Sequence, residues 1–96
     1  MRNLYLTNHS VVRAAQRFGN AAQGVDASDR DACRAWVRAN PASNRSIRAT
    51  VLAAAQEALA AGRRANRNGW VRTLAGDLAI VIRGTAITTV GFSSQL

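Results

Sequence analysis

The spacing of apolar residues changes twice along this chain of 96 residues, and each change predicts a change of secondary structure. Leu4 and Leu6 alternate with more polar neighbours, which indicates a short strand over 4–7. From His9 onward, apolar residues recur every three or four positions, and this period predicts a helix over 9–18. The chain is therefore expected to begin with a strand that runs directly into an amphipathic helix.

Two further segments carry the same helical spacing. The first, 29–39, follows Ser28, a good helix-capping residue, and its buried stripe includes Cys33. The second, 45–61, is rich in alanine and has high helix propensity. Pro41 lies between them and is expected to end the first, because a proline in a helix removes a backbone hydrogen bond. The first two thirds of the chain therefore predict three helices.

From Trp70 the pattern becomes that of strands separated by the turn-forming stretches AGD and GT. The predicted strands are 70–74, 78–83 and 86–92. The run LAIVI in the second of these is continuously apolar, as in a central strand covered on both faces. We expect one domain over 1–96 of the α+β class, with N-terminal helices packed on a C-terminal antiparallel sheet. The sheet would have three strands, or four if the 4–7 segment joins it.

The net charge of the chain favours some classes of binding partner over others. All thirteen basic residues are arginines, and with five acidic residues they give a net charge of +8 and an isoelectric point near 11.8. This excess favours a polyanionic partner, with nucleic acid ahead of a membrane surface. It argues against an acidic mimic of nucleic acid.

Several kinds of site are disfavoured by the residues present. A single cysteine excludes an internal disulfide and a cysteine-cluster metal centre. The acids are scattered and the glycines isolated, so we expect no metal and no nucleotide cofactor. No apolar run is long enough to span a membrane and no secretion signal is recognisable, so we expect a cytoplasmic protein without membrane contact. The chain could equally be the tip of a larger exported protein.

His9 is the only histidine, and it shares one helix face with Arg13 and Arg17 at spacings of four residues. This set suits metal-independent RNA cleavage, which needs a base for the 2′-hydroxyl and cations for the pentavalent phosphorus. Thr88 and Thr89 are neighbours on the last predicted strand, so one of them should face the helices and could orient the phosphate. We expect His9, Arg13 and one threonine to converge between the first helix and the sheet.

A second basic group precedes and enters the first strand of the C-terminal sheet. It comprises Arg63, Arg64, Arg67, Trp70 and Arg72. The arginines are candidates for binding phosphate, and the indole is a candidate for stacking on a base. These five residues are therefore predicted to bind nucleic acid.

Both ends of the chain resemble one family. LTNHSVVRAAQRFG resembles the T-x-H-A-x-x-R-x-x-x-R-G opening of the small domains that share the fold of barnase, EndoU, colicin D and RelE. LAIVIRGTAITTV resembles the closing hairpin of that group. The resemblance implies a ribonuclease toxin with His9, Arg13, Arg17 and Thr88 or Thr89 in its site. It further implies RNA, tRNA included, as substrate and a cognate immunity or antitoxin protein as partner, acidic to match this chain. Residues 21–61 have no counterpart in the resemblance.

Two other functions fit the same residues. A non-catalytic RNA- or DNA-binding protein would bind phosphate with the arginines of the 29–39 helix and of the 63–72 segment, and it would tolerate the loss of His9. A phage or mobile-element protein that binds another protein would carry its charge incidentally and show no affinity for RNA in moderate salt. His9 therefore separates the first alternative from a nuclease.

Overall fold

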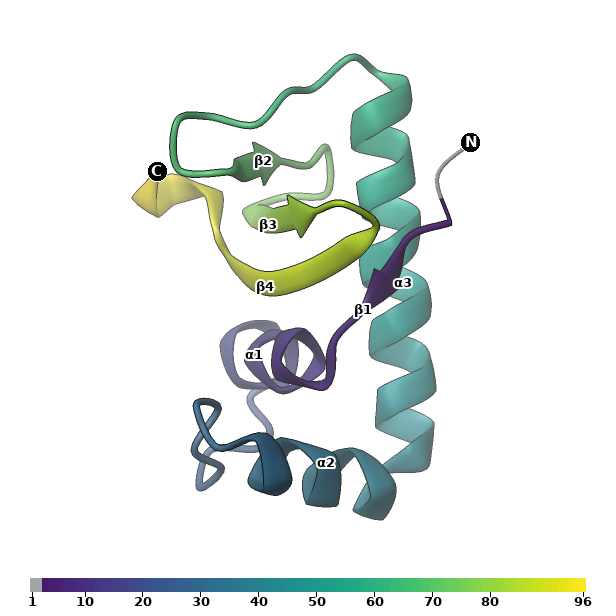
Figure 1. Cartoon of the computed structure of the whole chain (residues 1–96), viewed down its shortest axis with the longest axis vertical. Coiled ribbons are helices and arrows are strands. Elements are labelled where there is room, and N and C mark those ends of the chain that lie inside the picture. Colours follow the sequence, from purple (N-terminus) through teal and green to yellow (C-terminus); the bar gives the residue numbers. More distant parts are fainter. Residues whose placement is uncertain (1–2) are drawn as a thin grey trace.

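The computed structural model describes residues 3–96, which form three helices and a four-stranded sheet (Figure 1). In chain order the elements are β1 (Tyr5–Leu6), α1 (Asn8–Phe18), α2 (Arg30–Ala39), α3 (Pro41–Ala60), β2 (Trp70–Arg72), β3 (Leu78–Arg83), β4 (Ala86–Phe92) and the short 3₁₀ helix η1 (Ser93–Gln95). The α+β class is confirmed, with the three helices preceding the strands β2, β3 and β4. Within residues 3–96, no helix has the length and apolar character needed to cross a membrane.

The sheet has the order β1-β4-β3-β2, so β3 and β4 are its central strands. β2, β3 and β4 form the antiparallel meander that the turn signals predicted. β1 joins as the fourth strand but runs parallel to β4, with Tyr5 opposite Ala86 and Leu6 opposite Ile87. A parallel neighbour needs a long connection between the strands, and here the chain between β1 and β4 contains the three helices, β2 and β3. The complete sheet is therefore mixed.

The helix boundaries differ from expectation where capping chemistry decides them. Thr7 caps α1, since its hydroxyl oxygen accepts a hydrogen bond from the backbone N–H of Ser10. The expected cap of α2 was wrong by one residue, because Asp29 rather than Ser28 accepts from two N–H groups of the first turn. Pro41 begins α3 instead of lying in a linker, since the first helical position needs no N–H donor.

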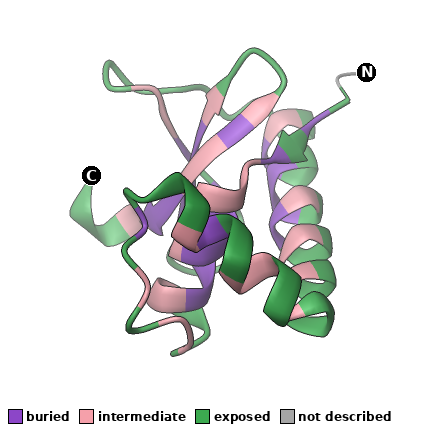
Figure 2. Ribbon diagram, turned by 60° about the horizontal axis from the view of Figure 1, so that its bottom comes forward, coloured by how far each residue is buried: buried purple, intermediate pink, exposed green. Residues whose placement is uncertain are grey.

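The main core lies between the sheet and the inner side of α3, while the outer side of α3 is exposed (Figure 2). The buried side chains of α3 are Val51, Ala54, Ala55 and Ala58. Their small size lets the helix approach the sheet closely. Val11 of α1 joins this core, whereas Val12 packs against Cys33 and Ala27 in a second cluster. The burial expected for Cys33 is confirmed, and α1 is held between two layers (Figure 1).

A β-bulge interrupts the pairing of β3 with β4. Val81 lies opposite Thr89 and Ile82 lies opposite Ile87, which leaves Thr88 as an extra residue on β4. The hairpin closes through Gly84, whose φ of 62° is a left-handed conformation that glycine adopts without strain. A bulge breaks the strict alternation of side chains along a strand. It occurs here at the two threonines of the predicted site.

Candidate functional site

His9 lies in the first turn of α1 with its ring held between a loop and the sheet. Its Nδ1 is 2.6 Å from the carbonyl oxygen of Ala27. A carbonyl can only accept, so Nδ1 donates and the lone pair of the neutral ring is on Nε2. Nε2 lies 3.4 Å from the hydroxyl oxygen of Thr89. The basic nitrogen of the ring therefore faces β4.

Both predicted threonines lie beside His9. Thr89 contacts the imidazole directly, and Thr88 lines the same cleft as the histidine. Thr88 also lies within 3.5 Å of the Val81 carbonyl, to which its hydroxyl donates. Alternation along a regular strand predicted that one threonine would reach the helix. The bulge at Thr88 breaks this alternation, and the second threonine, Thr88, lines the cleft.

A cleft of about 460 Å³ opens between the start of α1, the start of α2 and β4. Its basic side chains are His9, Arg30 and Arg34. Hydroxyl and amide groups complete the polar lining, from Thr7, Asn8, Ser28 and Thr88. Of the described residues that line the cleft, none carries a carboxylate. The cleft is therefore a cationic space next to a potential general base.

Arg13 and Arg17 lie further along α1. The Arg17 guanidinium donates to the carbonyl oxygen of Val90, and Arg13 donates to the Gln16 side chain at 3.3 Å. Burial, and after it the positive charge of Arg13, lowers the pKa of Arg17 below its ordinary value. The two arginines are thus electrostatic neighbours. In the part of the chain that the structure describes, neither lines the cleft, so they extend the basic surface beyond His9.

Gly91 lies where a residue of each predicted basic group, Arg17 of the first and Trp70 of the second, contacts β4. It is buried in β4, and a Cβ atom there would lie 2.8 Å from Cη2 of Trp70 and 3.0 Å from Nη1 of Arg17. The indole and the guanidinium therefore rest against the same point of the strand. Trp70 is half-buried as a result. An isolated glycine within a strand is the sequence signal for such a close approach.

Arg48 of α3 is a further residue of the site region that the pattern of the sequence did not single out. Its guanidinium donates to the carbonyl of Leu6, to Oδ1 of Asn8 at 2.8 Å and to Oδ1 of Asn44 at 2.7 Å. Burial lowers its pKa. Because arginine can only donate, the Asn8 oxygen faces Arg48 and the amide nitrogen is left to donate elsewhere. Arg48 thus fixes the junction from which His9 projects.

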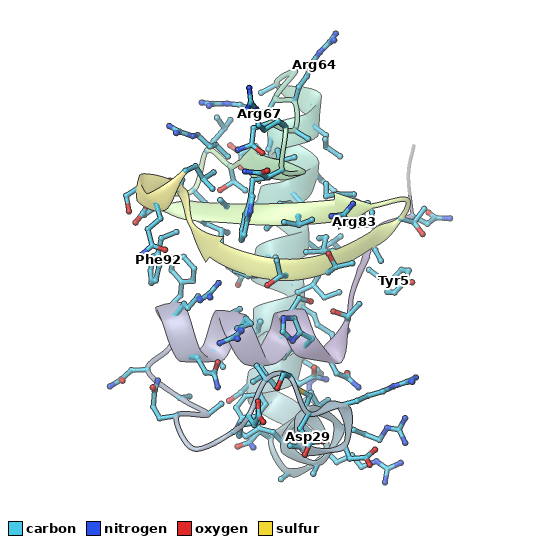
Figure 3. All side chains as sticks on the ribbon, turned by 60° about the vertical axis from the view of Figure 1, so that its left-hand side comes forward. Tyr5, Asp29, Arg64, Arg67, Arg83 and Phe92 are labelled. Carbon is cyan, nitrogen blue, oxygen red and sulfur yellow. The ribbon has the colours of Figure 1, made fainter. Side chains whose placement is uncertain are left out.

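The second basic group lies away from His9. Arg64 and Arg67 project from the loop between α3 and β2, at the end of the molecule opposite α1 and α2 (Figure 3). A small pocket of about 140 Å³ in this region is lined by Arg63, Arg64, Asn66, Trp70, Arg72 and Leu96. Arg67 is exposed and does not line this pocket. Trp70 is the member of the group that reaches toward Arg17.

Comparisons with protein-family models, with curated proteins and with solved structures found no match to this chain. The likeness of its two ends to the barnase, EndoU, colicin D and RelE domains stays a prediction. Residues 3–96 bring together no group of three or more His, Cys, Asp or Glu side chains suited to hold a metal ion. The geometry around His9 is therefore the feature that bears on function.

Proposed function

We propose that the chain is a metal-independent ribonuclease in which His9 accepts the proton of a ribose 2′-hydroxyl. One observation carries the proposal. The hydrogen bond from Nδ1 to the Ala27 carbonyl orients the ring so that Nε2 faces a hydroxyl-bearing strand beside a cationic cleft. A general base must be oriented in this way before it can take a proton from bound substrate.

In the proposed reaction the substrate supplies its own nucleophile. The 2′ oxygen attacks the adjacent phosphorus, a bond from O2′ to phosphorus forms, and the bond from phosphorus to O5′ breaks. His9 Nε2 takes the 2′ proton and later returns it to solvent, while the departing O5′ takes a proton from water. The products are a 2′,3′-cyclic phosphate and a 5′-hydroxyl.

The remaining site residues would stabilise the negative charge that develops on phosphorus-bound oxygens. The Thr89 hydroxyl lies next to the ring, and the Thr88 hydroxyl, which donates to the Val81 carbonyl in this structure, belongs to a residue that lines the same cleft. With substrate bound, each hydroxyl could rotate to donate to a phosphoryl oxygen. Arg17 and Arg13 supply positive charge along the same helix, and a planar guanidinium can bind two phosphate oxygens at once. Groups already in place where charge develops give the largest electrostatic contribution to such a reaction.

The test is the cleavage of total RNA by purified protein in the presence of a metal chelator. His9→Ala should lower the rate by a factor on the order of 10²–10⁴, as for a general base. His9→Asn is the sharper variant, because its amide can still donate to the Ala27 carbonyl but cannot act as a base. Arg13→Lys should also lower the rate, since an ammonium does not present a planar fork.

Gln56→Ala, on the exposed side of α3, is the matched control and should cut RNA like the parent. Circular dichroism checks that each variant folds. A folded His9→Asn variant that cleaves RNA at the parent rate would end the proposal.

A second candidate is a non-catalytic RNA-binding protein, which the pocket of Arg63, Arg64, Trp70 and Arg72 favours. It predicts RNA binding that weakens with salt, no RNA fragments from the parent, and unchanged affinity in His9→Asn. No affinity for RNA at moderate salt would instead favour the phage or mobile-element protein-binding module.

As a ribonuclease the chain would act in the cytoplasm, on tRNA or another accessible RNA. A cognate immunity or antitoxin protein would be acidic, because its charge must complement +8.

A further inference from the structure

We infer that the cleft beside His9 holds a second phosphate of the RNA strand, bound between Arg30 and Arg34 of α2. The inference rests on the proposed function and names the part of the substrate that occupies the cleft. If a second phosphate binds there, the enzyme requires an RNA strand that extends beyond the bond that is cut.

The two arginines are placed to act on one anion. They are four residues apart on α2, so their Cβ atoms lie about 6 Å apart on the same side of the helix. Both line the cleft that His9 and Thr88 also line. Like charges at this spacing repel each other, and an anion between them removes the repulsion.

The three nearby acids, Asp26, Asp29 and Asp31, do not line the cleft. Asp26 accepts hydrogen bonds from the hydroxyl and then the backbone N–H of Ser28, which hold its pKa below the ordinary value. Asp29 accepts from backbone N–H groups at the start of α2. Asp31 is exposed. Across the described residues that form the cleft, the charged side chains are all basic.

The cleft also has the size and the neutral polar groups that a nucleotide needs. A volume of about 460 Å³ exceeds that of a lone phosphate. Asn8 lines it, and because Arg48 occupies the Asn8 oxygen, the amide nitrogen is available as a donor. With the cut phosphate at His9 and Thr89, the neighbouring nucleotide of the same strand would enter the cleft. A single strand fits this path, since its backbone can bend away from the sheet.

The experiment compares three substrates: a dinucleoside monophosphate, the same molecule with a 5′-terminal phosphate, and the same molecule with a 3′-terminal phosphate. In the parent, one terminal phosphate should raise kcat/KM by about tenfold, the effect of one charge-assisted contact. The double variant Arg30→Gln with Arg34→Gln should lose that gain. Arg38→Gln, on the same helix but outside the cleft lining, is the matched control and should keep it.

A binding measurement separates this inference from the proposed function. A fluorescent DNA oligonucleotide has no 2′-hydroxyl and cannot be cut, so its affinity is measurable whether or not the protein cleaves RNA. The double variant should reduce the log–log salt slope by about 0.7 for the one lost phosphate contact, and Arg38→Gln should not.

If the parent cleaves RNA but the double variant keeps both the phosphate gain and the slope, the inference is overturned and the proposed function stands. If no RNA is cut but the slope falls only in the double variant, the proposed function is overturned and the phosphate site stands.

Discussion

Replacement of Gly91 by alanine tests the contact that joins Arg17 and Trp70 on β4. The new methyl group would lie 2.8 Å from Cη2 of Trp70 and 3.0 Å from Nη1 of Arg17. The guanidinium is the end of a flexible chain and can move, whereas the indole is rigid and its ring must shift as a whole. The indole therefore decides the outcome.

Two effects of opposite sign determine the magnitude. In a strand with free space, alanine in place of glycine stabilises by about 0.5–1 kcal/mol. Inserting a carbon into a packed contact costs about 1–3 kcal/mol. The contact outweighs the backbone gain, and we expect Gly91→Ala to lower the free energy of unfolding by about 1–2 kcal/mol. For a domain of this size that corresponds to a fall in Tm of roughly 4–16 °C.

Thermal unfolding by circular dichroism measures the loss, and a double-mutant cycle assigns it. In a Trp70→Leu background the rigid ring is absent, so Gly91→Ala should become neutral or stabilising. RNA cleavage by Gly91→Ala should fall as well, because Arg17 loses its place against the Val90 carbonyl. Gly24→Ala is the matched control, since nothing lies within 4 Å of the added carbon there, and it should not destabilise.

If Gly91→Ala is as stable as the parent, or if it costs the same with and without Trp70, the close packing of the indole on β4 is refuted.

Two further predictions concern stability away from the cleft. Arg48→Met should cost about 2–3 kcal/mol, because its acceptors at the β1–α1 junction lose a charged donor, whereas exposed Arg45→Met should cost about 0.5 kcal/mol or less in chemical denaturation. Hydrogen bonds from Ser93 and then Ser94 hold the pKa of Asp77 below its ordinary value of 3.8. Its stabilising effect is therefore complete above 3.8 and is lost as the pH falls through the lowered value. Between about pH 5 and pH 2 the Tm of the parent should converge on that of Asp77→Asn, and parallel curves would contradict this.

The elements of the fold were predictable because they depend on local periodicity. The segments 78–83 and 86–92 were predicted with their observed bounds, since GT and AGD are strong turn signals next to apolar runs. The parallel pairing of β1 with β4 was not predictable, because the direction of pairing depends on the path of the three helices and two strands between them. The start of α3 at Pro41 shows that a proline can mark either the end of one helix or the first turn of the next.

The sequence drew attention to His9 and the two threonines of the candidate site, but not to Arg48 or to the geometry of the site. A lone histidine in register with two arginines indicated His9, and hydroxyls on the last strand indicated Thr88 and Thr89. The carbonyl that orients the ring belongs to Ala27, in a loop that carries no pattern. A bulge depends on how two strands pair, so the sequence of one strand alone does not reveal it. The sequence offered the arginines of α2 only as phosphate-binding groups of a non-catalytic protein, whereas the structure places Arg30 and Arg34 at the cleft beside His9.

The hydrogen-bonding contact between His9 and Thr89 joins residues 80 positions apart. During synthesis the histidine emerges early and the threonine only after nearly all of the described chain has been made. Contacts of such long sequence separation form late in folding, because a long loop must close first. No fragment that lacks either β1–α1 or β4 contains the pair. If the proposed function holds, a truncated or nascent chain is inert toward RNA, and catalytic activity appears only in a chain that has folded as a whole.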